Sequence, residues 1–86
     1  MTLNMIRNKV KFLVSNIRYK EVNDLNLLTE YFWTTDDLLK RIYILEKEGK
    51  NLLSRDDKSK LHICKETVWS LRSSIRYRIS KIISNQ

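Results

Sequence analysis

Proline, glycine, cysteine and histidine are scarce in this chain of 86 residues, which has no Pro and only one each of Gly, Cys and His. Hairpins, barrels and sandwiches depend on Gly and Pro at their turns, so this scarcity favours helices. A single Cys excludes an internal disulfide framework and fits a reducing compartment. A chain of this length forms one domain, residues 1–86. We therefore expect a single all-α domain.

Patterns that would indicate an enzyme or a metal site are also missing. His62 and Cys64 are two residues apart, so on a helix their side chains diverge by roughly 200° and cannot share a metal ion or form a nucleophile and base pair. The adjacent aspartates at 36–37 and 56–57 lie at expected helix starts, where capping explains them better than acid–base chemistry. One glycine cannot make a phosphate-binding loop. We predict a protein that is not an enzyme, with no catalytic residues, metal ligands or cofactor.

Long apolar runs are absent too, since no stretch approaches the roughly 18 residues of a membrane span and the N-terminus lacks the apolar run of a secretory signal. Residues 1–20 hold cations but no Asp or Glu, which also resembles an organellar transit peptide. We expect a soluble cytoplasmic protein, or one of an organellar matrix if this segment is a targeting signal. The richness in Asn, Ile, Lys and Ser is typical of A·T-rich genomes, including those of many phages, and fits a short accessory factor.

Apolar residues recur every three to four positions, which predicts a small bundle of three to four helices with a long C-terminal helix. The expected helices cover residues 3–18, 24–33, 36–48 and 55–83. Their apolar seams are Leu3, Ile6, Val10, Leu13 and Ile17; Leu25, Leu28 and Phe32; Leu38, Leu39, Ile42 and Leu45; and Leu61, Cys64, Val68, Leu71, Ile75, Ile79 and Ile82. Because Cys64 lies on a seam, we expect it to be a buried, inert thiol.

Capping residues set the expected helix boundaries. Asn23 or Asp24 can cap the second helix, and Ser54, followed three residues later by an aspartate, can cap the last. Thr34 is followed by an aspartate at the same spacing, which predicts that a separate third helix begins there. Gly49 is expected to end this third helix in the left-handed conformation. Alternatively, the helix continues to Leu53 and Gly49 lies at a close helix crossing.

The length of the last helix predicts a protein interface. About 29 residues at roughly 1.5 Å each span ~43 Å, whereas a compact domain of this size is about 30 Å across. The helix should extend beyond its domain unless its last turns fray or it bends near residues 73–74. Its apolar distal half favours packing on a partner or on a second copy. The predicted interface residues are Ile75, Tyr77, Ile79, Ile82 and Ile83 of the last helix and Phe12 of the first.

Rows of cations lie beside the seams of both terminal helices and predict a nucleic-acid interface. The residues are Arg7, Lys11 and Arg18 in the first helix, and Lys58, Lys65, Arg72 and Arg76 in the last, with Trp69 at the edge of the row. If the two helices pack antiparallel or cross, the rows merge into one surface of the kind that phosphate backbones bind. Trp69 would stack on an unpaired base. With a net charge of +7, this pattern predicts binding to RNA or DNA, with RNA or single strands favoured over duplex DNA.

Other interpretations stay open. A cation row beside a seam is also typical of a solvated helix boundary, and a tryptophan at the position of Trp69 is more often a core residue than a stacking platform. The alternative function is a helical inhibitor or adaptor that docks on an acidic protein surface. Met5, Phe12 and Tyr19 lie off the first seam and would serve as anchors, unless the first helix is buried on two sides. A membrane-surface role is disfavoured because the amphipathic helices can satisfy one another.

Overall fold

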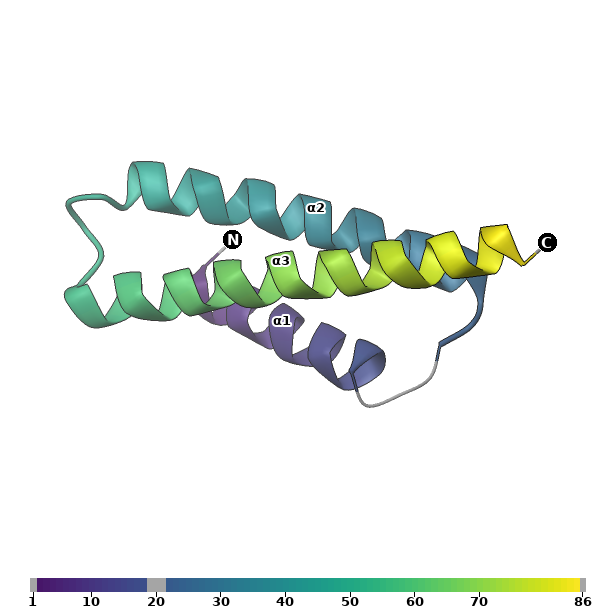
Figure 1. Ribbon diagram of the computed structural model, residues 1–86. Coiled ribbons are helices and arrows are strands. Elements are labelled where there is room, and N and C mark those ends of the chain that lie inside the picture. Colours follow the sequence, from purple (N-terminus) through teal and green to yellow (C-terminus); the bar gives the residue numbers. More distant parts are fainter. Residues whose placement is uncertain (1, 19–21, 86) are drawn as a thin grey trace.

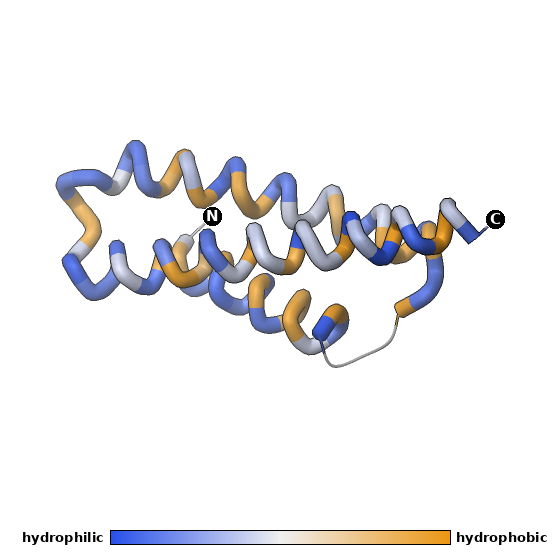
Figure 2. The backbone as a smooth tube through the Cα atoms, viewed as in Figure 1, coloured by the Kyte–Doolittle hydropathy of each residue, from blue (hydrophilic) through white to orange (hydrophobic). Residues whose placement is uncertain are grey.

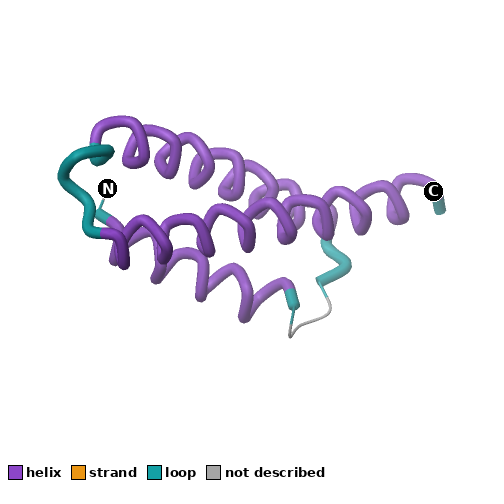
Figure 3. The backbone as a smooth tube through the Cα atoms, turned by 60° about the vertical axis from the view of Figure 1, so that its left-hand side comes forward, coloured by secondary structure: helices purple, strands orange, loops and turns teal. Residues whose placement is uncertain are grey.

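The computed structural model describes residues 2–18 and 22–85, and within them the chain forms three helices (Figure 1). Helix α1 spans Leu3–Ile17, α2 spans Leu25–Glu48 and α3 spans Arg55–Ser84. Helices α1 and α3 run in the same direction, and α2 runs antiparallel to both (Figures 1 and 3). The predicted all-α bundle with a long C-terminal helix is therefore confirmed. Tyr19, at the start of the predicted first turn, lies outside the described residues.

Each helix begins at a polar capping side chain, as the sequence predicts for α2 and α3. Thr2, Asp24 and Ser54 have extended backbone conformations. Their side-chain oxygens accept hydrogen bonds from backbone amides two or three residues later, at 3.3, 2.9 and 3.0 Å respectively. These bonds satisfy donors that have no partner inside the helix, and each contributes about 1 kcal/mol.

Helix α2 is continuous where the sequence predicts a break, so the division into helices 24–33 and 36–48 is wrong. The Thr34 hydroxyl donates a hydrogen bond to the Glu30 carbonyl at 2.9 Å, and the Thr35 hydroxyl donates to the Phe32 carbonyl at 2.6 Å. A threonine hydroxyl can cap a new helix or bond back to the preceding turn of the same helix. Here both hydroxyls bond back, and the fully buried Thr35 anchors this turn in the core.

Gly49 ends α2 without adopting the predicted left-handed conformation. Its φ and ψ are −89° and 6°, and its amide donates to the Leu45 carbonyl at 2.8 Å. The alternative, a helix continuing to Leu53, is also wrong, because α2 ends at Glu48 and residues 49–52 form a separate turn, in which the Leu52 and Leu53 amides donate to the Gly49 carbonyl. A Cβ at this position would lie 2.7 Å from the Leu45 oxygen and 2.8 Å from Leu53 Cγ. Close approach is therefore what requires glycine here.

The core runs along the whole bundle and contains residues from all three helices. Hydrophobic and hydrophilic positions alternate in bands along each helix (Figure 2). The buried apolar residues are Ile6, Val10, Leu13, Ile17, Leu28, Leu38, Leu39, Ile42, Leu61, Cys64, Val68, Leu71 and Ile75. Burying one such large aliphatic side chain contributes about 1.5–3 kcal/mol, so this core is the main source of stability. No helix in residues 2–18 and 22–85 has both the length and the apolar character needed to cross a membrane.

The molecule is elongated, measuring 50 × 21 × 17 Å, and the predicted overhang of the last helix is largely covered. Because α2 is one helix of 24 residues, its N-terminal half lies along the distal half of α3 (Figure 1). Ile75 is fully buried, and Ile79 and Ile82 are partly buried against the core. Helix α3 runs unbroken through residues 73–74 to Ser84, so its last turns are helical and not frayed.

Candidate nucleic-acid interface

The predicted cation row of α3 lies against α2. Lys65 Nζ is 3.3 Å from Glu46 Oε1 and 4.8 Å from the centroid of the Tyr43 ring. One helical heptad further along, the guanidinium carbon of Arg72 is 4.5 Å from the centroid of the Phe32 ring. This row therefore follows the side of α3 that faces α2.

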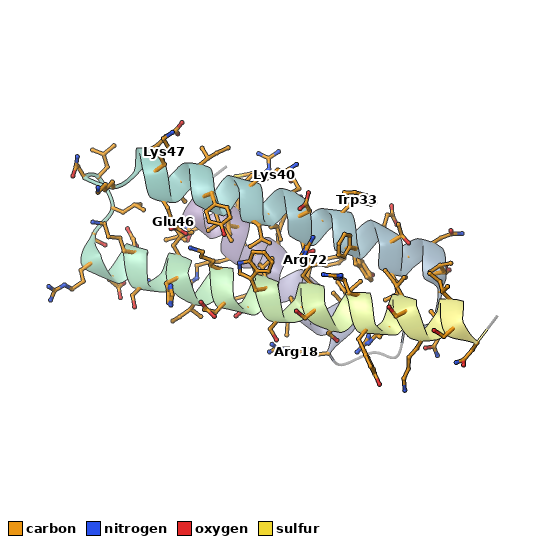
Figure 4. The ribbon with its side chains drawn as sticks, turned by 45° about the horizontal axis from the view of Figure 1, so that its top comes forward. Arg18, Trp33, Lys40, Glu46, Lys47 and Arg72 are labelled. Carbon is orange, nitrogen blue, oxygen red and sulfur yellow. The ribbon has the colours of Figure 1, made fainter. Side chains whose placement is uncertain are left out.

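The predicted cation row of α1 lies on the opposite side of α3. Arg18 Nη2 donates a hydrogen bond to Ser70 Oγ at 3.4 Å. Ser70 and Arg72 are two residues apart, which separates their side chains by roughly 160° around the helix. In Figure 4, Arg72 points toward α2 whereas Arg18 lies beyond the other side of α3. The predicted merging of the two rows is wrong, because α1 and α2 pack on different sides of α3.

A row on the solvent side of α2 adjoins the α3 row at the ring of Phe32, which contacts both Trp33 and Arg72. Trp33, Lys40 and Lys47 are spaced seven residues apart, which places them within roughly 40° of one another on a helix. Figure 4 shows all three along the same side of α2. The α2 and α3 rows together are called the α2–α3 face, and its residues are Trp33, Lys40, Lys47, Lys58, Lys65, Trp69, Arg72 and Arg76.

Aromatic rings and one guanidinium connect the two helices across this face. The rings of Trp33 and Phe32 meet edge to face, with centroids 5.7 Å apart and an interplanar angle of 77°. Phe32 contacts Arg72, whose guanidinium carbon is also 5.5 Å from the centroid of the Trp69 ring. Trp33 is 62% exposed and Trp69 is 41% exposed. The expectation that Trp69 could be a core residue is therefore wrong, and each end of this series presents an accessible indole.

Arg72 makes no ion pair or hydrogen bond with any residue that the structure describes. Its Nε is buried and has no hydrogen-bond acceptor, a situation that costs about 1–3 kcal/mol for an ordinary buried donor. Contact with two aromatic rings offsets part of this cost, since a partly desolvated cation–π contact contributes about 1–2 kcal/mol. The guanidinium is thus fixed in position but its hydrogen-bonding capacity is largely unused.

The α2–α3 face keeps a net positive charge after the ion pairs within it are counted. Lys40 pairs with Asp36 at 3.4 Å, and Lys65 pairs with Glu46. The other cations of the face make no ion pair within the described part of the chain, and these are Lys47, Lys58, Arg72 and Arg76. Near the α2–α3 turn, Lys50 and Lys58 also line a pocket of about 310 Å³. A polyanion lying along this face would meet unpaired cations at both ends.

Sequence reasoning did not identify Trp33, Lys40 and Lys47 as site residues. Their heptad spacing, on the side of α2 opposite its buried seam, was the available signal. It was missed because the expected break at Thr34 assigned Trp33 and Lys40 to two different helices. Once α2 is known to be continuous, a helical wheel places all three residues along one side of it.

The predicted protein-interface residues divide into buried and exposed sets. Ile75 is a core residue, because the N-terminal half of α2 covers it, and is not available to a partner. Phe12, Tyr77 and Ile83 are 59%, 62% and 57% exposed. Helix α1 is not buried on two sides, since Met5 is exposed along with Phe12. Phe12 also borders a groove between α1 and α2.

The structure confirms that Cys64 is buried. Burial raises the pKa of its thiol, and the positive charge of Arg7 opposes this shift without cancelling it. His62 is exposed and its Nε2 is 3.8 Å from Glu66 Oε1. Within residues 2–18 and 22–85, no three His, Cys, Asp or Glu side chains are grouped closely enough to hold a metal ion.

Comparisons with known protein families, with curated proteins and with solved structures find no match to this chain.

Proposed function

We propose that this protein binds single-stranded nucleic acid, RNA in particular, along the α2–α3 face. The observation that carries the proposal is the position of Arg72. It is stacked on Phe32 and Trp69, has no carboxylate partner among the described residues, and lies between two exposed tryptophans. An arginine fork suits phosphate oxygens, and tryptophan rings stack on unpaired bases. The protein would act as a small accessory factor, with no catalytic step, metal or cofactor.

In this mechanism, bases stack on Trp33 and Trp69 while the backbone follows the cations of the face. Stacking contributes about 1–3 kcal/mol per base and tolerates any base, because every base has a π face. Phosphate contacts to Lys47, Lys58 and Arg76 add affinity that depends on counterion release. Binding should therefore favour single strands over duplexes and show little base specificity. The single buried thiol fits a reducing compartment such as the cytoplasm.

Fluorescence anisotropy with single-stranded RNA, duplex RNA and duplex DNA over a salt series tests the proposal. Two stacked bases predict a preference for the single strand of about tenfold or more. Replacing Lys47 and Arg76 with Gln should reduce the slope of log affinity against log salt by about 0.7 for each phosphate contact that is lost.

The matched control removes two positive charges from another part of the surface. Lys9 and Arg41 are exposed and lie outside the α2–α3 face, so their replacement with Gln should leave the slope nearly unchanged. If wild-type protein binds none of the three nucleic acids at low salt, the proposal is wrong. If both double variants reduce the slope equally, the site is not the α2–α3 face.

A second candidate function is a protein adaptor or inhibitor, supported by the exposure of Phe12. The groove beside it contains pockets of about 400 and 320 Å³, one lined by Lys9 and Thr34 and the other by Leu27 and Tyr31. Large aromatic side chains next to a groove are common anchors in protein interfaces. For a given partner, Phe12→Ala should then abolish binding without altering the fold, whereas an alanine at Trp33 should leave the affinity unchanged.

A further inference from the structure

A second basic surface lies on the side of α3 that contacts α1. It combines two described segments that contain no Asp or Glu, residues 2–18 and 67–85. This surface is called the α1–α3 face, and its cations are Arg7, Lys11, Arg18, Arg78 and Lys81. Lys11 and Lys81 are exposed. None of the five makes an ion pair with a residue that the structure describes.

Two arginines of this face donate hydrogen bonds to neutral oxygens of the described chain, not to carboxylates. Arg78 Nη2 donates a hydrogen bond to the Ile17 carbonyl at 2.7 Å, at the C-terminal end of α1. Its Nη1 is buried without a partner. Arg18 bonds the hydroxyl of Ser70. These bonds hold both guanidiniums where α1 and α3 meet, and neither pairs with a carboxylate of residues 2–18 or 22–85.

The two basic faces lie on different sides of the molecule, so a short strand bound along one face leaves the other face free. They lie on sides of α3 that are roughly 160° apart, and the bundle measures 21 × 17 Å in cross-section. The Debye length at physiological salt is about 8 Å. Two polyanions on opposite faces would therefore be separated by about twice the screening length, and their mutual repulsion would be weak.

We infer that the α1–α3 face binds a second nucleic-acid strand, so that one protein molecule bridges two strands. This inference rests on the proposed function of the α2–α3 face. Arg7, Lys11 and Arg18 are spread over about 16 Å of helix length, a distribution that a continuous phosphate backbone can follow. Insertion into a membrane is disfavoured because the apolar seam of α1 is buried in the core. This face has no tryptophan, and its Lys81 Nζ lies 5.1 Å from the centroid of the exposed Tyr77 ring. The second strand is therefore held mainly through its backbone and dissociates at lower salt than the first.

The test mixes two non-complementary single-stranded RNAs, one labelled with a donor fluorophore and the other with an acceptor, and measures fluorescence energy transfer between them. Sedimentation gives the mass of the complex. Wild-type protein should bring the strands together in a complex of one chain and two strands. Replacing Lys11 and Lys81 with Gln should weaken binding of the second strand by about tenfold. Replacing both with Glu should abolish energy transfer, while the first strand binds within about threefold of wild type. The Lys9→Gln and Arg41→Gln control should bridge normally.

Every other outcome contradicts the inference, and each one points to a different explanation. If wild-type protein binds one strand but gives no energy transfer, bridging is wrong and the proposed function stands. A complex of two chains and two strands would assign bridging to a protein dimer. If protein saturated with RNA sediments with phosphatidylserine vesicles but takes no second strand, this face binds lipid headgroups instead. If no strand binds at all, both the inference and the proposed function fail.

Discussion

Arg72 of α3 lies over the ring of Phe32 of α2, with its guanidinium carbon 4.5 Å from the ring centroid. The same guanidinium contacts Trp69 at 5.5 Å, so it joins the two long helices and also lies between the aromatic side chains of the α2–α3 face. The stability of the α2–α3 pairing and the proposed binding of phosphate therefore depend on the same side chain.

The substitution Arg72→Lys should separate the contribution of ring stacking to stability from the contribution of the positive charge. Lysine keeps the positive charge but loses the planar group that contacts two rings, so the free energy of unfolding should fall by about 1 kcal/mol. Urea denaturation measures this change. Arg76→Lys, at an exposed position on the same face, should change the free energy by less than about 0.5 kcal/mol. Equal values for the two variants would mean that stacking of Arg72 contributes nothing measurable.

The exposed tryptophans should report directly on bound bases. Trp33→Ala and Trp69→Ala should each weaken binding of single-stranded RNA by about 1–3 kcal/mol and change duplex binding much less. Quenching of tryptophan fluorescence by the single strand gives an independent measurement. Phe12→Ala, which removes an exposed aromatic ring from a different surface, is the matched control. A similar loss of affinity in all three variants would contradict stacking at the α2–α3 face.

Proline at position 36 distinguishes one continuous helix from two. If a helix began near Thr34, Asp36 would lie in its first turn, where proline is tolerated. In the continuous α2, Asp36→Pro removes a hydrogen bond in the helix interior and should cost about 3 kcal/mol or more. Thermal and urea unfolding measure the effect.

Two controls accompany this substitution. Asp36→Ala removes only the surface ion pair with Lys40 and should cost less than about 1 kcal/mol. Arg55→Pro places proline at the first position of α3, after the extended Ser54, and should be nearly neutral. If Asp36→Pro is no more destabilising than Asp36→Ala, the helix is broken in solution.

The buried thiol of Cys64 should make stability depend on alkaline pH. Burial raises the pKa of Cys64 in the folded protein, so the unfolded chain loses the thiol proton first as the pH rises. The contribution of the protonated thiol to stability is fully present below its ordinary pKa of about 8.5 and is lost as the pH rises through the folded pKa. The difference in unfolding free energy between wild type and Cys64→Ala should therefore decrease above this pH. Parallel profiles for the two proteins would contradict the shift.

Arg7 provides a second check on Cys64, because its charge acts in the opposite direction to burial. Arg7→Gln should raise the pKa of the thiol further, and the folded protein should then react more slowly with a thiol reagent at a fixed alkaline pH. Lys9→Gln, which removes a charge that has no such influence on Cys64, should leave the rate unchanged.

Much of the fold follows from local patterns in the sequence. The seam residues from Ile6 to Ile17 and from Leu61 to Ile75 are buried as predicted, because a period of 3.6 residues places them on one side of a helix. Asp24 and Ser54 begin their helices as predicted, because their side-chain oxygens bond to nearby amides. Such interactions span a few residues, so they can be read without knowing the partners of a helix.

Sequence alone determined the class of structure, the buried side of each segment and the presence of cation rows beside the seams. Only the tertiary structure decided whether Thr34 and Thr35 cap a helix or bond back within one, because their hydroxyls can do either. It also decided that the α3 row lies beside α2, where Arg72 meets Phe32, and not beside α1. A helical period fixes the angle of a side chain around its own axis, whereas the neighbour it faces depends on how all the helices pack together.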